Sequence, residues 1–64
     1  MSNKIAWIDL GRPFGGSVTI SVFDIESIET DADTTWIGFR SGRTMAVTES
    51  REQVKEKIEQ CLSK

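Results

Sequence analysis

The chain has 64 residues, a single cysteine and no histidine, and its ten acidic and eight basic residues give a net charge of −2. A chain of this length forms one domain, residues 1–64, and buries only about 60% of the surface that it exposes when unfolded. With one cysteine and no histidine, the chain has almost no residues with which to form a disulfide or a metal site. We therefore expect added stability to come from assembly into a homo-oligomer. The acidic balance disfavours binding to long DNA or RNA, which requires a basic surface.

The single thiol, Cys61, favours a reducing compartment. The first ten residues, MSNKIAWIDL, lack the long apolar stretch of a signal peptide or a membrane-spanning helix. We therefore expect a cytoplasmic protein that does not engage a membrane.

The first half of the chain has the composition of β-strands. Residues 4–10 are rich in β-forming side chains, and residues 17–22 alternate apolar Val18, Ile20 and Val22 with polar positions. Two strands are predicted from these runs.

The alternation changes phase in the next segment, residues 24–30. Ile25 and Ile28 are three positions apart, so we expect a β-bulge or a tight turn near Phe23 and Asp24. The acidic stretch that follows is predicted to be a turn.

A hairpin is predicted from residues 34–40 and 43–48, which flank Ser41 and Gly42. A strict two-residue turn would divide the apolar side chains between both faces of the sheet. A type I turn followed by a G1 bulge, with Gly42 in the left-handed conformation, avoids this. It places four apolar side chains on one face: Ile37, Phe39, Met45 and Val47.

Trp36 lies on the other face of this hairpin, beside the small residues Gly38 and Ala46. The shallow slot that results has two interpretations. It packs against the rest of the fold or a neighbouring subunit, or it receives a ligand.

The chain ends in a predicted helix that begins with a capping box, in which Ser50 and Gln53 exchange hydrogen bonds. An apolar stripe follows and should cover the sheet: Val54, Ile58, Cys61 and Leu62. We expect Cys61 to act as a small hydrophobic residue. The predicted fold is mainly β (α+β): a small antiparallel β-barrel-like or SH3-like sheet of about five short strands with one C-terminal α-helix.

Hydrophobic, turn and capping positions recur in a recognisable order over residues 17–58: Ile25, Glu26, Ile28, Glu29, Gly42, Val47, Glu49, Ser50 and Val54. In this order they resemble the FlbD-like family of small flagellar and swarming-motility proteins. The resemblance implies a small barrel-like domain with a C-terminal helix, no enzyme activity and a role in bacterial motility. The chain departs from the family at residues 11–16, where GRPFGG replaces a short turn.

The GRPFGG segment contains the parts of an anion-binding loop. Glycines let backbone amides approach a ligand, an arginine offers a bidentate fork to a phosphate, and an aromatic ring offers a stacking surface. The candidate residues are Gly11, Arg12, Phe14, Gly15 and Gly16. The alternative is a flexible loop in which Phe14 packs onto the barrel and Arg12 is solvated.

Three further residues complete the predicted ligand-binding set: Trp36 of the slot, and Arg40 and Arg43 of the second hairpin. Both arginines add positive charge to the site if a subunit interface brings them near the loop. Otherwise they are solvated.

Catalysis is not predicted, because without histidine no nucleophile–base pair can be named. The acidic residues are predicted to form a solvated face, since they lack the spacing of a calcium loop: Asp24, Glu26, Glu29, Asp31 and Asp33. We expect neither a metal nor a cofactor.

Two functions of different class remain open. The first is a non-catalytic, oligomeric binding protein that captures a small anionic, nucleotide-type ligand, for example a phage-encoded sponge of an immune signal. The second is a FlbD-like motility accessory that acts through protein–protein interaction. A nucleotide binder requires Arg12 and stacking on Phe14, whereas a protein adaptor uses Phe14 as an apolar anchor.

Overall fold

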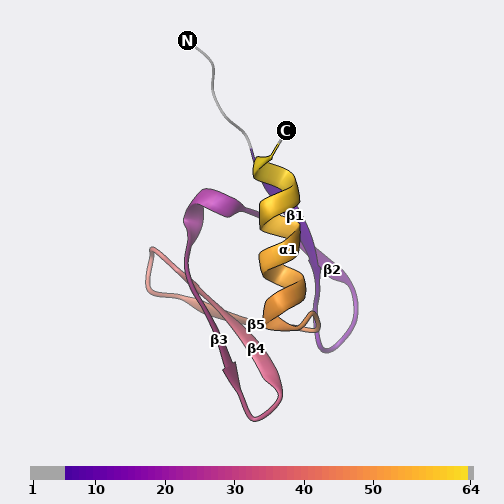
Figure 1. Cartoon of the computed structure of the whole chain (residues 1–64). Helices are drawn as coiled ribbons and strands as arrows, with labels where there is room; N and C mark the ends of the chain where they lie inside the picture. Colours follow the sequence, from indigo (N-terminus) through magenta and orange to yellow (C-terminus); the bar gives the residue numbers. More distant parts are fainter. Residues whose placement is uncertain (1–5, 64) are drawn as a thin grey trace.

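A computed structural model describes residues 6–63 of the chain (Figure 1). Within this range the elements are β1 (Trp7–Gly11), β2 (Ser17–Ser21), the 3-10 helix η1 (Val22–Asp24), β3 (Ile25–Asp31), β4 (Thr34–Phe39), β5 (Thr44–Val47) and α1 (Arg51–Leu62). The prediction of a mainly β, α+β fold with five short antiparallel strands and a C-terminal helix is confirmed. Residues 4 and 5 of the predicted first strand lie outside the described residues.

The five strands form two antiparallel sheets that do not close into a barrel. β1 pairs with β2, with Leu10 opposite Val18, and the second sheet has the order β3-β4-β5. A backbone hydrogen bond of 3.0 Å links the sheets, from the N–H of Thr48 after β5 to the carbonyl of Gly11 at the end of β1. The expected barrel-like closure is therefore corrected to two separate sheets.

Side chains, rather than a strand, occupy the outer edge of β1. Alternate residues of an antiparallel strand direct their N–H and C=O groups away from the partner strand. Lys57 of α1 donates a 2.7 Å hydrogen bond to the carbonyl of Asp9, and Cys61 Sγ lies 3.7 Å from the carbonyl oxygen of Trp7. These contacts from α1 satisfy two carbonyls on the edge of β1 that faces away from β2.

The hydrophobic core receives side chains from both sheets and from the helix. Leu10 of β1, Ile37 of β4 and Val54 of α1 are the largest fully buried residues. Burial of a side chain of this size contributes about 1.5–3 kcal/mol. The buried hydrophobic residues of the described range are all small or medium aliphatic side chains: Ala6, Ile8, Leu10, Ile20, Val22, Ile37, Val47 and Val54.

The chain passes from the first sheet to the second through η1, where the phase change was expected. The side chain of Ser21 accepts a 3.3 Å hydrogen bond from the N–H of Phe23 and so caps this short helix. A register shift follows in β3 between Ile25 and Ser27. Of the two expected alternatives near Phe23 and Asp24, the structure has a tight turn, η1, and a bulge-like register shift follows it in β3.

The larger sheet contains the predicted hairpin around Ser41 and Gly42, and a second hairpin whose turn lies in the acidic stretch that was predicted to be a turn. The β3–β4 connection is a two-residue turn in which Ala32 and Asp33 have positive φ, as a type I′ turn requires. In the β4–β5 hairpin, Ile37 pairs with Met45 and Trp36 pairs with Ala46, which is the predicted register.

Helix α1 begins at the predicted capping box. The Ser50 hydroxyl accepts a 3.1 Å bond from the N–H of Gln53, whose side chain accepts a 2.9 Å bond from the N–H of Ser50. Val54 is buried, whereas Leu62 is 52% exposed and does not complete the predicted stripe. Ile58 and Cys61, the other members of the stripe, are partly buried and pack against the core.

Figure 1 shows α1 lying alongside β1, with the end of the helix near the start of that strand. Within residues 6–63, no helix combines the length and the apolar character that crossing a membrane requires.

Candidate anion-binding site

The segment between β1 and β2 is a tight hairpin turn rather than a flexible loop. In this first turn (residues 12–16), the N–H of Arg12 donates to the carbonyl of Gly16 at 3.1 Å, and the N–H of Gly15 donates to the carbonyl of Arg12 at 3.0 Å. This is the pattern of a type I turn followed by a G1 bulge, with Gly15 at φ +107°. Pro13 occupies the second turn position, where its fixed φ fits the turn.

The β4–β5 hairpin contains a second turn (residues 39–43) with the same hydrogen bonds. The N–H of Phe39 donates to the carbonyl of Arg43 at 2.8 Å, and the N–H of Gly42 donates to the carbonyl of Phe39 at 2.9 Å. Gly42 has φ +94°, so the predicted left-handed glycine is confirmed. The N–H of Arg40 donates in addition to the carbonyl of Asp24 at 3.0 Å, which fixes the second turn against the start of β3.

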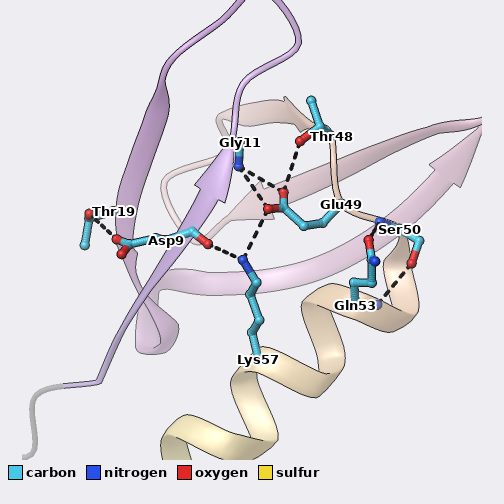
Figure 2. A network of polar contacts seen from close by, with 8 residues as sticks. All are labelled: Asp9, Gly11, Thr19, Thr48, Glu49, Ser50, Gln53 and Lys57. Atoms are coloured by element: carbon cyan, nitrogen blue, oxygen red, sulfur yellow. Dashed lines mark hydrogen bonds and ion pairs between the residues drawn. The ribbon is translucent and has the colours of Figure 1, made fainter.

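The base of the first turn is held by Glu49, just before α1, and by Lys57 in the middle of that helix (Figure 2). The N–H of Gly11 donates to both carboxylate oxygens of Glu49, at 2.9 and 3.2 Å. Lys57 Nζ lies 3.2 Å from Glu49 Oε2 and joins this carboxylate to the edge of β1. We call Gly11, Glu49 and Lys57 the clasp.

The clasp stabilises the charged form of its carboxylate. Burial raises the pKa of Glu49, but hydrogen bonds from the N–H of Gly11, from its own N–H and from Lys57 together outweigh this effect. The pKa of Glu49 therefore lies below its ordinary value of 4.5. Glu49 is ionised at neutral pH and keeps the Gly11 amide occupied.

Arginines from both turns line one concave region, which we call the arginine pocket. Its volume is about 480 Å³, within the range of small-molecule sites. The lining residues are Arg12, Asp24, Phe39, Arg40, Ser41, Arg43, Thr44 and Met45. Arg12 thus shares a pocket with Arg40 and Arg43 within one chain, whereas sequence reasoning required a subunit interface for this.

A second concave region, the aromatic groove, adjoins the arginine pocket and has a volume of about 350 Å³. It is lined by Arg12, Pro13, Phe14, Gly15, Trp36, Thr44, Met45 and Ala46. Three residues line both regions: Arg12, Thr44 and Met45. The predicted loop and the predicted tryptophan slot are therefore parts of one continuous surface.

Exposure differs sharply between the two aromatic rings of the groove. Phe14 is fully exposed at the tip of the first turn, so the alternative in which it packs onto the fold is wrong. Trp36 is 38% exposed on the face of β4 that also carries Gly38. Ser27 Oγ occupies the space above Gly38, so the open part of the slot lies beside Ala46 instead.

Two of the candidate glycines have roles inside the protein. The N–H of Gly11 donates to Glu49, and the carbonyl of Gly11 accepts from Thr48, so neither group is free to contact a ligand. Gly16 accepts the hydrogen bond that closes the first turn. The main contribution of these residues is therefore to hold the turn that carries Arg12 and Phe14.

The electrostatics of the arginine pocket favour an anion. Among the described residues, the one ion pair joins Lys57 to Glu49, so none of the three pocket arginines forms a close ion pair with a described carboxylate. Asp24 is the single acidic residue that lines the pocket. Guanidinium groups donate in a planar fork that matches phosphate and carboxylate oxygens and do not ligate metals.

Sequence reasoning did not include five lining residues of the arginine pocket in the site: Asp24, Phe39, Ser41, Thr44 and Met45. The signal for Asp24 is the pairing of β3 with β4, since Ile25 lies opposite Phe39 and so brings Asp24 to the second turn. The pairing of β3 with β4 was not predicted from the sequence, so Asp24 was not placed near the second turn.

Comparisons of this chain with protein-family models, with curated proteins and with solved structures find no match. The FlbD-like resemblance stays a prediction.

Proposed function

We propose that this protein is a non-catalytic, oligomeric binding protein that captures a small anionic ligand of the nucleotide type, as a sponge for a signalling molecule does. The observation that carries the proposal is the convergence of Arg12, Arg40 and Arg43 on one pocket that continues into the groove beside Trp36. Arginine forks bind phosphate, and indole and phenyl rings stack on bases. One free thiol, Cys61, is compatible with action in the cytoplasm.

A thermal-shift screen against linear and cyclic nucleotides tests this function. A ligand that binds the folded state alone, at about 100 times its Kd, raises the free energy of unfolding by about 2.7 kcal/mol. Arg12→Ala should weaken binding of the nucleotide that gives the largest shift by about 10- to 150-fold, the loss of one charge-assisted hydrogen bond. Arg51→Ala, at the start of α1 and outside both lining sets, is the matched control.

The screen has clear negative results. Unchanged melting temperatures with all nucleotides would reject the proposed function. The same conclusion follows if Arg12→Ala and Arg51→Ala bind equally well.

Self-association is part of the proposal. The described chain exposes five large hydrophobic residues: Trp7, Phe14, Phe23, Trp36 and Leu62. Small domains with a limited core commonly gain stability by association. Light scattering at micromolar concentration should give a mass above 7.2 kDa, and a stable 7.2 kDa species with a cooperative melt would reject this part of the proposal.

A protein-binding accessory function, as in the FlbD-like family, is the second candidate. The full exposure of Phe14 favours it, because an aromatic side chain at the tip of a rigid turn suits insertion into a partner's pocket. Under this alternative Phe14→Ala abolishes capture of the partner and Arg12→Ala does not. Under the nucleotide proposal both substitutions weaken binding, and Phe14→Ala loses about 1–3 kcal/mol of stacking energy.

A further inference from the structure

We infer that two copies of this chain associate by antiparallel pairing of their β2 strands, Ser17–Ser21. This pairing joins the two-stranded sheet of each copy into one sheet that is continuous across the interface. The inference rests on the self-association included in the proposed function and assigns a surface to it. It does not depend on which ligand the protein binds.

The outer edge of β2 has free backbone groups. Thr19 lies opposite Asp9, whose carbonyl points away from β2 and accepts a hydrogen bond from Lys57. In an antiparallel hairpin, both members of such a pair direct their backbone groups outward. Ser17, Thr19 and Ser21 therefore direct N–H and C=O away from β1. In the described part of the chain, no backbone hydrogen bond outside the strand pairs reaches these groups.

The other described strand edges are less suited to pairing. β5 has four residues, and Thr48 directly after it already donates to Gly11. β3 contains the acidic residues Glu26, Glu29 and Asp31, all exposed, which would repel a second copy of the same strand. β2 contains neither a charged residue nor proline, the residues that commonly protect an edge strand.

Pairing through β2 ends at two copies. β2 lies on one side of β1, and α1 lies along the other side (Figure 1). After two β2 strands pair, the joined sheet is therefore bounded by a helix at each end. A two-fold contact of this kind uses the same surface in both copies and closes, so it forms a dimer rather than a filament.

The side chains of β2 fit a second copy of the same strand. Pairing centred on Thr19 places this residue opposite Thr19 of the second copy and places Ser17 opposite Ser21. All three side chains are short and uncharged, and cross-strand hydroxyl pairs of this type are favourable. Each opposed pair exchanges two backbone hydrogen bonds, about six in total. Buried Ile20 and half-buried Val18 stay on the core face of each copy.

Exposed aromatic rings at the two ends of β2 support the same register. Phe14 lies five positions before Thr19, and Phe23 lies four positions after it. Antiparallel pairing centred on Thr19 brings the first turn of each copy beside η1 of the other. Phe14 is fully exposed and Phe23 is 45% exposed, so their proximity would cover apolar surface on both copies. No residue of β2 itself lines the arginine pocket or the aromatic groove.

Mass and amide exchange, measured over a concentration series of the full chain, test the inference. Light scattering should show the mass rise from 7.2 kDa towards twice that value. Hydrogen exchange followed by NMR should show the N–H of Thr19 protected in the dimer and exchanging at least about 10-fold faster after dilution. The N–H of Thr30, an exposed residue of the edge strand β3, is the control and should not respond to concentration.

Charge variants test whether the partner is a second β2. Thr19→Lys and Thr19→Glu each place like charges opposite one another at the centre of the pair and should weaken the dimer by about 10-fold. An equal mixture of the two variants should restore it, because lysine then faces glutamate. Thr30→Lys and Thr30→Glu are the matched controls on β3 and should leave association unchanged. A circular dichroism melt of each variant confirms that it is folded.

The outcomes separate the inference from the function on which it rests. If a dimer forms but Thr19→Lys leaves it intact, or if the N–H of Thr19 exchanges equally fast at every concentration, β2 is not the interface and the inference is rejected. Weakening by the Thr30 variants instead would assign the interface to β3. A mass of 7.2 kDa at every concentration would reject both the inference and the self-association part of the proposed function. Nucleotide binding is judged separately by the thermal-shift screen.

Discussion

The two turns that form the arginine pocket have the same backbone hydrogen bonds but different supports. The second turn is held by its own hairpin and by one bond to the start of β3, from Arg40 to Asp24. The first turn is held by groups nearly forty residues later in the chain, since Glu49 accepts the N–H of Gly11. Both turns have the same geometry. The second is maintained by a backbone carbonyl at the start of β3, and the first by a carboxylate far away in the sequence.

This difference shows where the structure depends on long-range contacts. The second turn requires local pairing of β3, β4 and β5, which follow one another along the chain. The position of the first turn depends on α1, because Lys57 and Glu49 join the edge of β1 to the helix. Matched substitutions in the two hairpins test whether both turns contribute equally to the free energy of unfolding.

The largest expected effect comes from the buried side chains behind the turns. Leu10→Ala in the first hairpin and Ile37→Ala in the second should each lower the free energy of unfolding by about 2–5 kcal/mol, because each leaves a cavity in the shared core. Chemical denaturation followed by tryptophan fluorescence measures the loss. Two separate unfolding transitions in either variant would show that the hairpins unfold independently.

The glycines of the turns should give the next largest effect. Gly15→Ala and Gly42→Ala each place a side chain at positive φ and should cost about 1–2 kcal/mol. Neither new methyl group would contact another residue, so the cost comes from the backbone alone. Equal shifts of the denaturation midpoint are expected, and a neutral Gly15→Ala would mean that the first turn adopts another conformation.

The clasp, which supports the first turn alone, should make the free energy of unfolding depend on pH. The pKa of Glu49 is below 4.5 in the folded chain, so its ionisation stabilises the fold at pH values above 4.5. This contribution is lost as the pH falls through the lowered folded pKa. Denaturation curves between pH 7 and pH 3 should show this loss, and Glu49→Gln should reduce it.

At pH 7, Glu49→Gln should cost about 0.5–1.5 kcal/mol, because the amide oxygen still accepts from Gly11 while the charged contact with Lys57 is lost. Glu52→Gln, on an exposed carboxylate of the same helix, is the control. Identical pH profiles for both variants would contradict a stabilising role of the clasp.

Proline gives the smallest expected effect. Pro13→Ala should destabilise the fold by about 0.4–1 kcal/mol, since it frees the unfolded chain at a position suited to proline. Arg40→Pro places proline at the matching position of the second turn and should give no gain, because it removes the bond from Arg40 to Asp24. A clear rise in melting temperature for Arg40→Pro would show that this bond contributes little.

Local patterns predicted much of this structure. The left-handed Gly42, the hairpin register and the capping box at Ser50 each depend on residues within a few positions, and the structure confirms all three. Hydrophobic spacing likewise indicated an irregularity near Phe23 and Asp24, where the structure has η1. Such features depend on which residue types tolerate a given backbone conformation and on the alternation of side chains along a strand. Both can be read from a single sequence.

Contacts between distant segments were not predictable in the same way. Nothing in the spacing of Glu49 and Lys57 indicates that they contact the edge of β1. The first turn also has two adjacent glycines, Gly15 and Gly16, both at positive φ, so its hydrogen bonds could not be assigned from the sequence. The shared arginine pocket follows from how the two sheets are placed.

The cover that α1 provides along β1 has a consequence for how copies of this chain meet. A strand with free N–H and C=O groups is a template for intermolecular pairing and for amyloid-like growth. Lys57 and Cys61 block that template at Asp9 and Trp7. Loss or unwinding of the helix would expose this edge of β1, so the C-terminal segment covers a site of possible intermolecular strand pairing as well as contributing Val54 to the core.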